Sequence, residues 1–173
     1  KVVVSNDPQA QALKLAEQHG IPTVDISHKT IKRRDHEQKI LDQLEQYQID
    51  LVVLAGYMRV LSKHFLKAFE DPDGFFKVVN IHPSLLPSFP GINAYRDAFE
   101  YGVKVSGVTV HLVDEKVDHG PILAQEPFPR FPDDNLEVFS ARGLSVEHAL
   151  YPAVLDQIAK NGIKLPRRET VKK

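Results

Sequence analysis

Leu51-Val52-Val53-Leu54-Ala55 is an uninterrupted apolar run that ends at Gly56. A half-exposed strand would alternate apolar and polar side chains, whereas a parallel strand covered on both faces is apolar throughout. We therefore expect a central parallel strand here, buried on both faces. This run predicts an α/β fold, and the patterns on either side of it agree.

The residues before this run alternate between strand and helix patterns. Residues 2–5 form a short β-branched run, and Asp7-Pro8 is typical of a helix start, with a cap and then proline at the first helical position. That helix should end near His19, and a short strand should follow at 23–25. Residues 35–48 predict an amphipathic helix that covers a sheet, because apolar side chains recur on one stripe: Ile40, Leu41, Leu44 and Tyr47.

Strand and helix patterns also alternate after Gly56. We expect helices at 63–69, 93–101 and 136–160, the last kinked by Pro152, and strands at 76–81, 105–113 and 122–128. Prolines at 83, 87 and 90 exclude regular structure between the expected strand 76–81 and the expected helix 93–101. The order predicts one domain, 1–173, with an open, mostly parallel twisted α/β sheet and helices on both faces. Ligands of such sheets bind beyond the carboxyl ends of the strands.

Composition narrows the possible partners. The 173 residues are 42% hydrophobic and 26% charged, with a formal net charge of -1 and no cysteine. A near-neutral chain has no basic field for nucleic-acid phosphates or anionic lipid, so we expect neither partner. Without cysteine there is no disulfide or thiolate nucleophile. No signal peptide or spanning helix is recognisable, which predicts a cytoplasmic protein, monomeric or homodimeric, that acts on small molecules.

Polar side chains gather where one expected strand ends. Asn80 and His82 are one residue apart, so the period of two places both side chains on the same face. Pro83 ends the strand where the sheet opens to a crevice. An isolated Asn or His at a strand end is usually an ordinary hydrogen-bonding residue, so this pair alone leaves both readings open.

A second polar group follows on strand 105–113. Gly107, Thr109 and His111 share one face of that strand, and the alternate residues form an apolar face. The Gly120-Pro121 turn can aim one carboxylate of the charged segment 114–121 back at the strand ends. Equally, the charged residues after the strand suit a solvated surface turn.

Taken together, three segments resemble the folate-dependent formyltransferases in content, order and spacing. They are Asn80-Ile81-His82-Pro83-Ser84-Leu85-Leu86-Pro87-Ser88-Phe89-Pro90-Gly91, Gly107-Val108-Thr109-Val110-His111 and Asp118-His119-Gly120-Pro121-Ile122. Two further segments resemble the purine-pathway branch of that family: Ala55-Gly56-Tyr57-Met58-Arg59-Val60-Leu61 and Glu147-His148-Ala149-Leu150-Tyr151-Pro152. The resemblance implies the Rossmann-like formyltransferase fold. It also implies transfer of the formyl group of 10-formyltetrahydrofolate to the amine of 5'-phosphoribosylglycinamide, in purine biosynthesis, without a metal.

The resemblance also implies roles for individual residues. The catalytic residues would be Asn80, His82 and Asp118. The folate would contact Arg33, Met58, Arg59, Val60, Leu61, Asn80, Leu112 and Val117, with residues 111–118 forming a loop around its pteridine. The ribonucleotide would contact Gly56, Pro83, His111 and Glu147.

These residue types suit direct formyl transfer. The amine attacks the formyl carbon, and the negative oxygen that develops would be bound by the Asn80 amide and a protonated His82. Removing one such donor typically raises the barrier by ~2.7–4 kcal/mol. Asp118 would support the charge on His82 and accept the proton of the amine through a water. Ser84 is not expected to act as a nucleophile, because no nucleophile elbow accompanies it.

Several alternatives remain. The side chains of His82, His111, Asp118 and His119 could bind zinc, although their spacing matches no compact ligand motif. A formyltetrahydrofolate deformylase would use similar residues with water as acceptor, and a transfer-RNA formyltransferase would need a second, basic domain. A non-catalytic folate-binding module would bind without turnover.

The amino-terminal residues differ from the family pattern. The family opens with a strand and a Gly/Ser/Asn loop that cradles the ribonucleotide phosphate, whereas this sequence has no glycine before Gly20. We therefore expect residues 1–173 to lack that first strand and phosphate loop, and to bind formylfolate better than the nucleotide.

Overall fold

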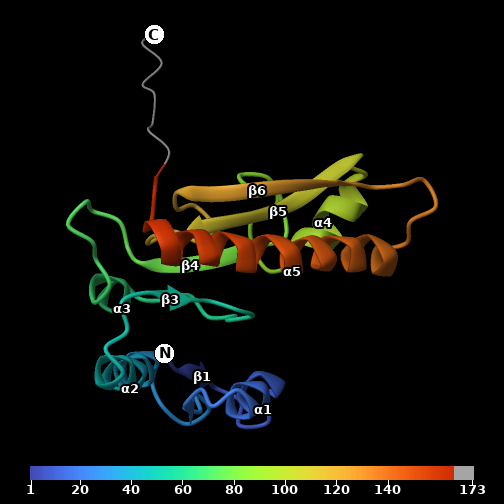
Figure 1. The fold of residues 1–173 in the computed structure, drawn as a ribbon. Helices are drawn as coiled ribbons and strands as arrows, with labels where there is room; N and C mark the ends of the chain where they lie inside the picture. The colour runs from blue at the N-terminus through green and yellow to red at the C-terminus, as the bar shows by residue number, and fades with distance from the viewer. Residues whose placement is uncertain (166–173) are drawn as a thin grey trace.

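The computed structural model describes residues 1–165, whose strands form two sheets (Figure 1). β1 (Val3–Ser5) and β2 (Thr23–Asp25) pair in parallel and are joined through α1 (Gln11–Gln18). A four-stranded sheet has the order β3 (Val52–Val53), β4 (Val78–His82), β5 (Val105–Leu112) and β6 (Ile122–Pro129). The other helices are α2 (Arg33–Gln46), α3 (Lys63–Lys67), α4 (Ala94–Tyr101) and α5 (Leu136–Asn161). The expected α/β class with an open sheet is confirmed.

The strand directions differ from the expectation of a mostly parallel sheet. β3 and β4 are parallel, but β4 pairs antiparallel with β5, and β5 pairs antiparallel with β6. A short connection without a helix, residues 113–121, joins β5 to β6, and only antiparallel neighbours can be joined in that way. The four-stranded sheet is therefore mixed.

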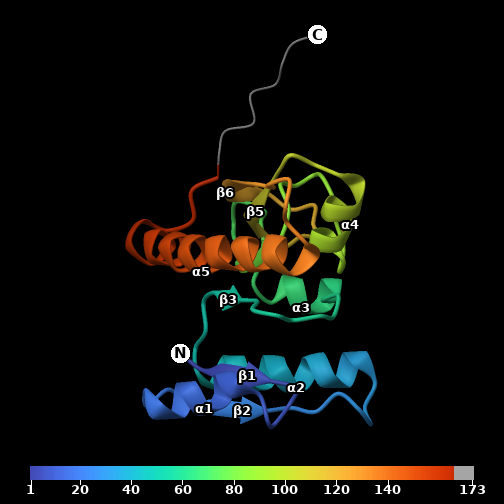
Figure 2. The same cartoon turned by 90° about the vertical axis from the view of Figure 1, so that its right-hand side faces the viewer.

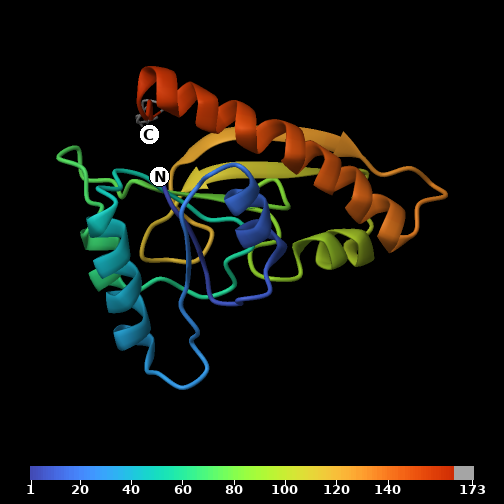
Figure 3. The same cartoon turned by 60° about the horizontal axis from the view of Figure 1, so that its bottom comes forward.

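Helices cover both faces of the four-stranded sheet, as expected. Val78 packs in a buried cluster with Phe65 and Leu66 of α3, while its neighbour Val79 packs with Val154 of α5 on the other face. α5 runs along β5 and β6 (Figures 1 and 3). The unit made of β1, β2, α1 and α2 lies on the far side of β3 from β5 and β6 (Figures 1 and 2).

The first helix begins later than Asp7-Pro8 predicts. Asp7 Oδ1 accepts a hydrogen bond from the N–H of Gln9 at 3.0 Å, and the Asp7 carbonyl accepts one from Ala10 at 3.1 Å. An aspartate can stabilise a turn in this way as readily as it caps a helix. The prediction that Asp7 caps the helix and Pro8 begins it is therefore wrong, and the helix itself starts at Gln11.

The prediction that residues 51–55 form a strand buried on both faces is wrong. β3 is only Val52–Val53, and Val53 is 42% exposed. Within residues 1–165, β3 pairs with β4 alone, because β1 and β2 form a separate sheet. The strand therefore lies at an edge, where one side of its backbone and part of its side chains remain open.

The amphipathic helix is confirmed as α2. Ile40 and Leu44 are buried, and Leu41 packs against the same cluster, which also contains Val78 of β4. The stripe of apolar residues therefore joins α2 to the edge of the four-stranded sheet.

Candidate active site

The first part of the site is a pair of side chains that face one another across β4 and β5. The antiparallel register places Asn80 opposite His111 and His82 opposite Thr109. The amide nitrogen Nδ2 of Asn80 lies 3.3 Å from Nε2 of His111. Asn80 and His82 therefore lie on the same face of β4, as the period of two predicts.

Asp118 reaches the same place from the connection between β5 and β6. Its Oδ2 lies 3.4 Å from Nδ1 of His82 and accepts a hydrogen bond from the N–H of Gly91 at 2.7 Å. Asp118 has a left-handed φ of 52°, which aspartate tolerates better than most residues. At Gly120, a Cβ would lie 1.9 Å from the carbonyl oxygen of Leu112, so this tight turn requires glycine. The expectation that this turn aims one carboxylate at the strand ends is confirmed, and the carboxylate is that of Asp118.

His82 is held on both sides of its ring. Nε2 donates to the carbonyl oxygen of Phe89 at 2.9 Å, while Nδ1 faces the Asp118 carboxylate. The side chain is only 5% exposed. Both ring nitrogens face oxygen atoms, which hold the ring in one orientation.

The surroundings of His111 favour its neutral form. Burial, the main influence, lowers its pKa below the ordinary value, although Asp118 and the Leu112 carbonyl act against this. Nδ1 donates to the carbonyl oxygen of Leu112 at 2.9 Å, which leaves Nε2 as an acceptor for the Asn80 amide. The separation of 3.8 Å between Nε2 and Asp118 Oδ1 is too long for a hydrogen bond, so we regard His111 as neutral rather than ion-paired. The second N–H of Asn80 stays available to a ligand.

The loop of residues 83–91 covers the polar face of β5. Thr109 Oγ1 donates to the Ser84 carbonyl at 2.6 Å and accepts from the N–H of Leu86 at 3.1 Å. Gln125 Nε2 donates both to Thr109 Oγ1 at 2.9 Å and to the Leu86 carbonyl at 3.0 Å. Both faces of β5 are therefore buried, and the loop places Phe89 and Gly91 against His82 and Asp118. Sequence reasoning missed Gln125, which only its pairing with Thr109 on the neighbouring strand identifies.

The residues expected to contact folate divide into open and buried side chains. Met58, Val60 and Val117 are 71%, 53% and 56% exposed, whereas Leu61 and Leu112 lie in the core at 7% and 0%. Only the backbone of those two leucines can meet a ligand. The loop after β5 lies beside the start of α3, because Lys63 Nζ is 2.7 Å from Glu115 Oε1.

The residues expected to contact the ribonucleotide lie on several elements. Glu147 of α5 accepts a hydrogen bond from the hydroxyl of Tyr95 at 2.6 Å. Tyr95 and Pro83 line a small pocket of about 200 Å³ at the start of α4. His111 lies at the base of the polar face, and Gly56, with a left-handed φ of 64°, turns the chain after β3.

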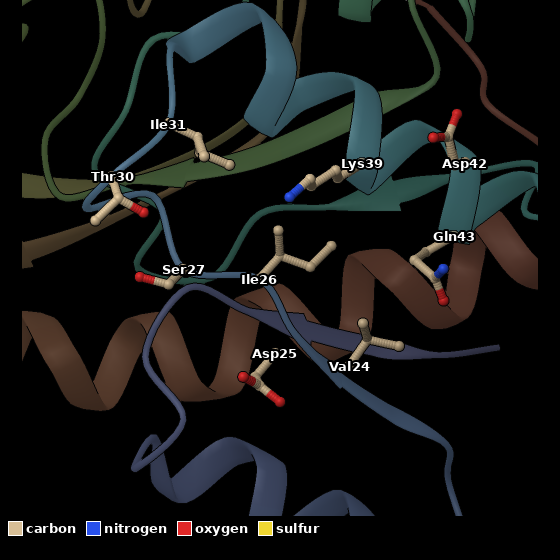
Figure 4. Close-up of a pocket in the computed structure, with 9 residues that line it drawn as sticks. All are labelled: Val24, Asp25, Ile26, Ser27, Thr30, Ile31, Lys39, Asp42 and Gln43. Carbon is tan, nitrogen blue, oxygen red and sulfur yellow. The ribbon is translucent and has the colours of Figure 1, made fainter.

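A larger pocket of about 510 Å³ lies elsewhere, between β2 and α2 (Figure 4). Its lining residues include Asp25, Lys39 and Asp42, and none of the residues predicted for the site. Opposite charges there offset one another, so we place the chemistry at the strand ends instead.

The described residues give no compact cluster of metal ligands. Within residues 1–165, no group of three or more His, Cys, Asp or Glu side chains could hold a metal ion. His119, which the zinc alternative required, instead contacts Asp114 at 2.6 Å. No helix in the same range has the length and apolar content that a membrane crossing requires.

Comparison with known proteins places the chain in a family. Residues 1–155 match the family described as formyl transferase. Phosphoribosylglycinamide formyltransferase of Bacillus subtilis (strain 168) is 42% identical over 158 residues, which cover 91% of this chain and 78% of that protein. The human trifunctional purine biosynthetic protein adenosine-3 is 43% identical over 165 residues, but the chain spans only 16% of its length.

A solved structure agrees with this placement. The crystal structure of phosphoribosylglycinamide formyltransferase from Bacillus halodurans is 40% identical, with a TM-score of 0.85 and coverage of 94% of this chain and 81% of that one.

Proposed function

We propose that the chain, which belongs to the formyl transferase family, transfers the formyl group of 10-formyltetrahydrofolate to the amine of 5'-phosphoribosylglycinamide in purine biosynthesis. The observation that carries this proposal is the convergence of Asn80, His82 and Asp118 at the strand ends. The names of the relatives that are about 40% identical support the choice of acceptor.

Direct attack of the amine on the formyl carbon explains why these residue types are needed. The intermediate carries a negative oxygen, and the free N–H of Asn80 is suited to bind it. An oxyanion donor of this kind typically contributes ~2.7–4 kcal/mol to lowering the barrier. Asn80 is half-buried beside the fully buried His111, and the partial exclusion of water strengthens that hydrogen bond.

His82 and Asp118 supply charge and proton transfer. A positive His82 stabilises the developing oxyanion electrostatically, and its Nε2–H can bind that oxygen once it exchanges the Phe89 carbonyl for it. Asp118 carries the opposite charge and is placed to take the proton that the amine loses, through a water. The bond between the formyl carbon and the folate nitrogen then breaks, and that nitrogen leaves with the proton returned through the same water. General acid–base help of this kind contributes roughly 10²–10⁴ in rate.

The outer part of the site suits a flat, partly apolar ligand. The exposed side chains of Met58, Val60 and Val117 can cover the ring system of the folate. Arg33 is 46% exposed and Arg59 is half-buried, so both can meet its carboxylates. Glu147 would bind the ribonucleotide from the opposite side.

The test is an assay with 10-formyltetrahydrofolate and either phosphoribosylglycinamide or water alone as acceptor. We expect transfer to the amine, and His82→Ala or Asp118→Asn should lower kcat by about 10²-fold or more. Calorimetry should show that both variants still bind the folate. The control is His119→Ala, a histidine whose side chain is 57% exposed.

Three results would contradict the proposal. Equal turnover without the amine would identify a deformylase instead. Folate binding without any turnover would indicate a binding module. Full activity in both variants would show that His82 and Asp118 do not have the roles assigned to them.

A further inference from the structure

We propose that Glu37 is a positioning residue for folate binding, because its buried carboxylate fixes both the segment 58–61 and Arg33 in one arrangement. This inference rests on the proposed function and goes further, since Glu37 touches neither the reacting atoms nor the predicted catalytic residues. Glu37 lies on α2, in the unit made of β1, β2, α1 and α2, whereas the predicted catalytic residues lie on β4 and on the connection between β5 and β6.

The carboxylate of Glu37 is the centre of a buried cluster. Glu37 is only 2% exposed. Oε1 accepts hydrogen bonds from the backbone N–H of Ser62 at 2.9 Å and from Nε of Arg33 at 3.1 Å, and Oε2 accepts one from the Ser62 hydroxyl. Removing a carboxylate from water is unfavourable unless such partners replace the lost hydration.

Ser62 connects this cluster to the expected folate segment. It directly follows Leu61, which lies in the core, and its Oγ accepts from the N–H of Phe65 at 3.2 Å to cap α3. Residues 58–60 are thus held between the turn at Gly56 and a serine that Glu37 holds by backbone and side chain. Two of their side chains, Met58 and Val60, remain exposed.

Arg33 is turned outward by the same carboxylate. Because its Nε is bonded to Glu37, the terminal nitrogens of its half-exposed guanidinium are free to point away from the cluster. Tyr57 lies close to the same charged side chains. Its pKa is raised by burial and by the charge of Glu37, whereas the charges of Arg59 and Arg33 act in the opposite direction. Glu37, Arg33 and Arg59 therefore all lie near Tyr57, next to segment 58–61, where an anionic, partly aromatic ligand would meet both arginines.

This arrangement makes a kinetic prediction for Glu37→Gln. The amide keeps the shape and can still present its oxygen to the Ser62 N–H and to Arg33, but it then places an NH2 group against the Ser62 hydroxyl and removes the negative charge that holds Arg33. Segment 58–61 and Arg33 should therefore be held less firmly. We expect the KM for 10-formyltetrahydrofolate to rise about tenfold. The KM for phosphoribosylglycinamide and the value of kcat should stay within about twofold, because the catalytic side chains are untouched.

The matched control is Glu45→Gln, on the exposed side of the same helix, which should change none of these constants. Ser62→Ala gives a second test, because it removes one of the three hydrogen bonds to Glu37, together with the cap of α3, and leaves the bond from the Ser62 N–H. It should raise the same KM by a smaller factor. The double variant Glu37→Gln/Ser62→Ala should resemble Glu37→Gln alone, since both changes disrupt one cluster.

The outcomes separate this inference from the proposed function. If the unaltered protein transfers no formyl group, the proposed function fails. If it is active but the KM for the folate is unchanged in Ser62→Ala and in any folded Glu37→Gln protein, the positioning role is wrong. The role is also wrong if kcat and both KM values change together, which would indicate a general loss of structure.

Discussion

Asn80 illustrates how one amide can serve two partners. One N–H is directed at His111, which holds the side chain in place, and the second is the donor that we propose for the formyl oxygen. His111 can act as the acceptor only while it is neutral, and its burial favours that form by lowering the pKa. The orientation of Asn80 therefore depends on the protonation state of a residue that need not touch the reacting atoms.

The amide hydrogens of Asn80 can be tested by two substitutions. We expect Asn80→Ala and the isosteric Asn80→Asp both to lower kcat by about 10²–10³-fold, because neither a methyl group nor a carboxylate donates a hydrogen bond. Steady-state kinetics measures kcat, and calorimetry should show folate binding within a few-fold of the unaltered protein. Activity retained in Asn80→Asp would mean that the side chain only fills space.

At the scale of elements, the loop 83–91 acts as a cover for β5. Its backbone contacts two catalytic side chains, through the carbonyl of Phe89 and the N–H of Gly91. The loop is held at its other end by Thr109 and Gln125, whose hydrogen bonds are to backbone groups of Ser84 and Leu86. Because both ends belong to one short loop, loosening one end should disturb the other.

The bracing by Gln125 gives a prediction at this scale. Gln125→Ala removes two hydrogen bonds from partly buried partners, which should lower the free energy of unfolding by about 1–3 kcal/mol. It should also lower kcat, because Phe89 and Gly91 lose their fixed positions. Urea denaturation and steady-state kinetics measure the two effects.

The matched control is Glu126→Ala. Glu126 is exposed and follows Gln125 directly on β6, so its side chain lies on the opposite face of that strand from the loop. A loss of stability in Gln125→Ala with kcat unchanged would show that the loop does not transmit the disturbance to the catalytic residues.

At the scale of the whole molecule, α5 ties the edge of the sheet to its centre. The hydroxyl of Tyr151 lies 2.8 Å from the carbonyl oxygen of Leu54 and 3.0 Å from that of Val79, so it bridges the chain after β3 and strand β4. Glu37 makes the corresponding link from α2 to α3. The expected catalytic and folate-binding residues are therefore held together by contacts between elements that are distant in the sequence.

The stability of the molecule should depend on pH through His111. Its pKa is lowered in the folded protein, so the unfolded chain takes up the proton first as the pH falls below the ordinary histidine value of about 6.5. Stability is therefore unaffected above that value and is lost as the pH falls toward the lowered pKa. In His111→Asn, the fall in the free energy of unfolding between about pH 7.5 and about pH 5.5 should be smaller. Urea denaturation at both values measures it.

Both proteins contain the same other histidines, so the difference between the two pH dependences isolates His111. Identical pH dependence in His111→Asn and the unaltered protein would show that His111 does not favour the neutral form.

The local patterns of the sequence predicted much of the fold and the centre of the site. The stripe of α2 and the shared face of Asn80 and His82 follow from helical and strand periods, which depend only on near neighbours. The Gly120-Pro121 turn likewise indicated the return of one carboxylate to the strand ends, because a tight turn is a local property.

Contacts between distant residues were decided only by the tertiary structure. An apolar run such as 51–55 does not state how many strands flank it, so the edge position and exposure of β3 could not be predicted. Nor could the bonds from Glu37 to Ser62 and from Gln125 to Thr109, because each polar group could equally have faced water. Residue type and spacing determine which chemistry a side chain can perform, but its partner depends on how whole elements pack.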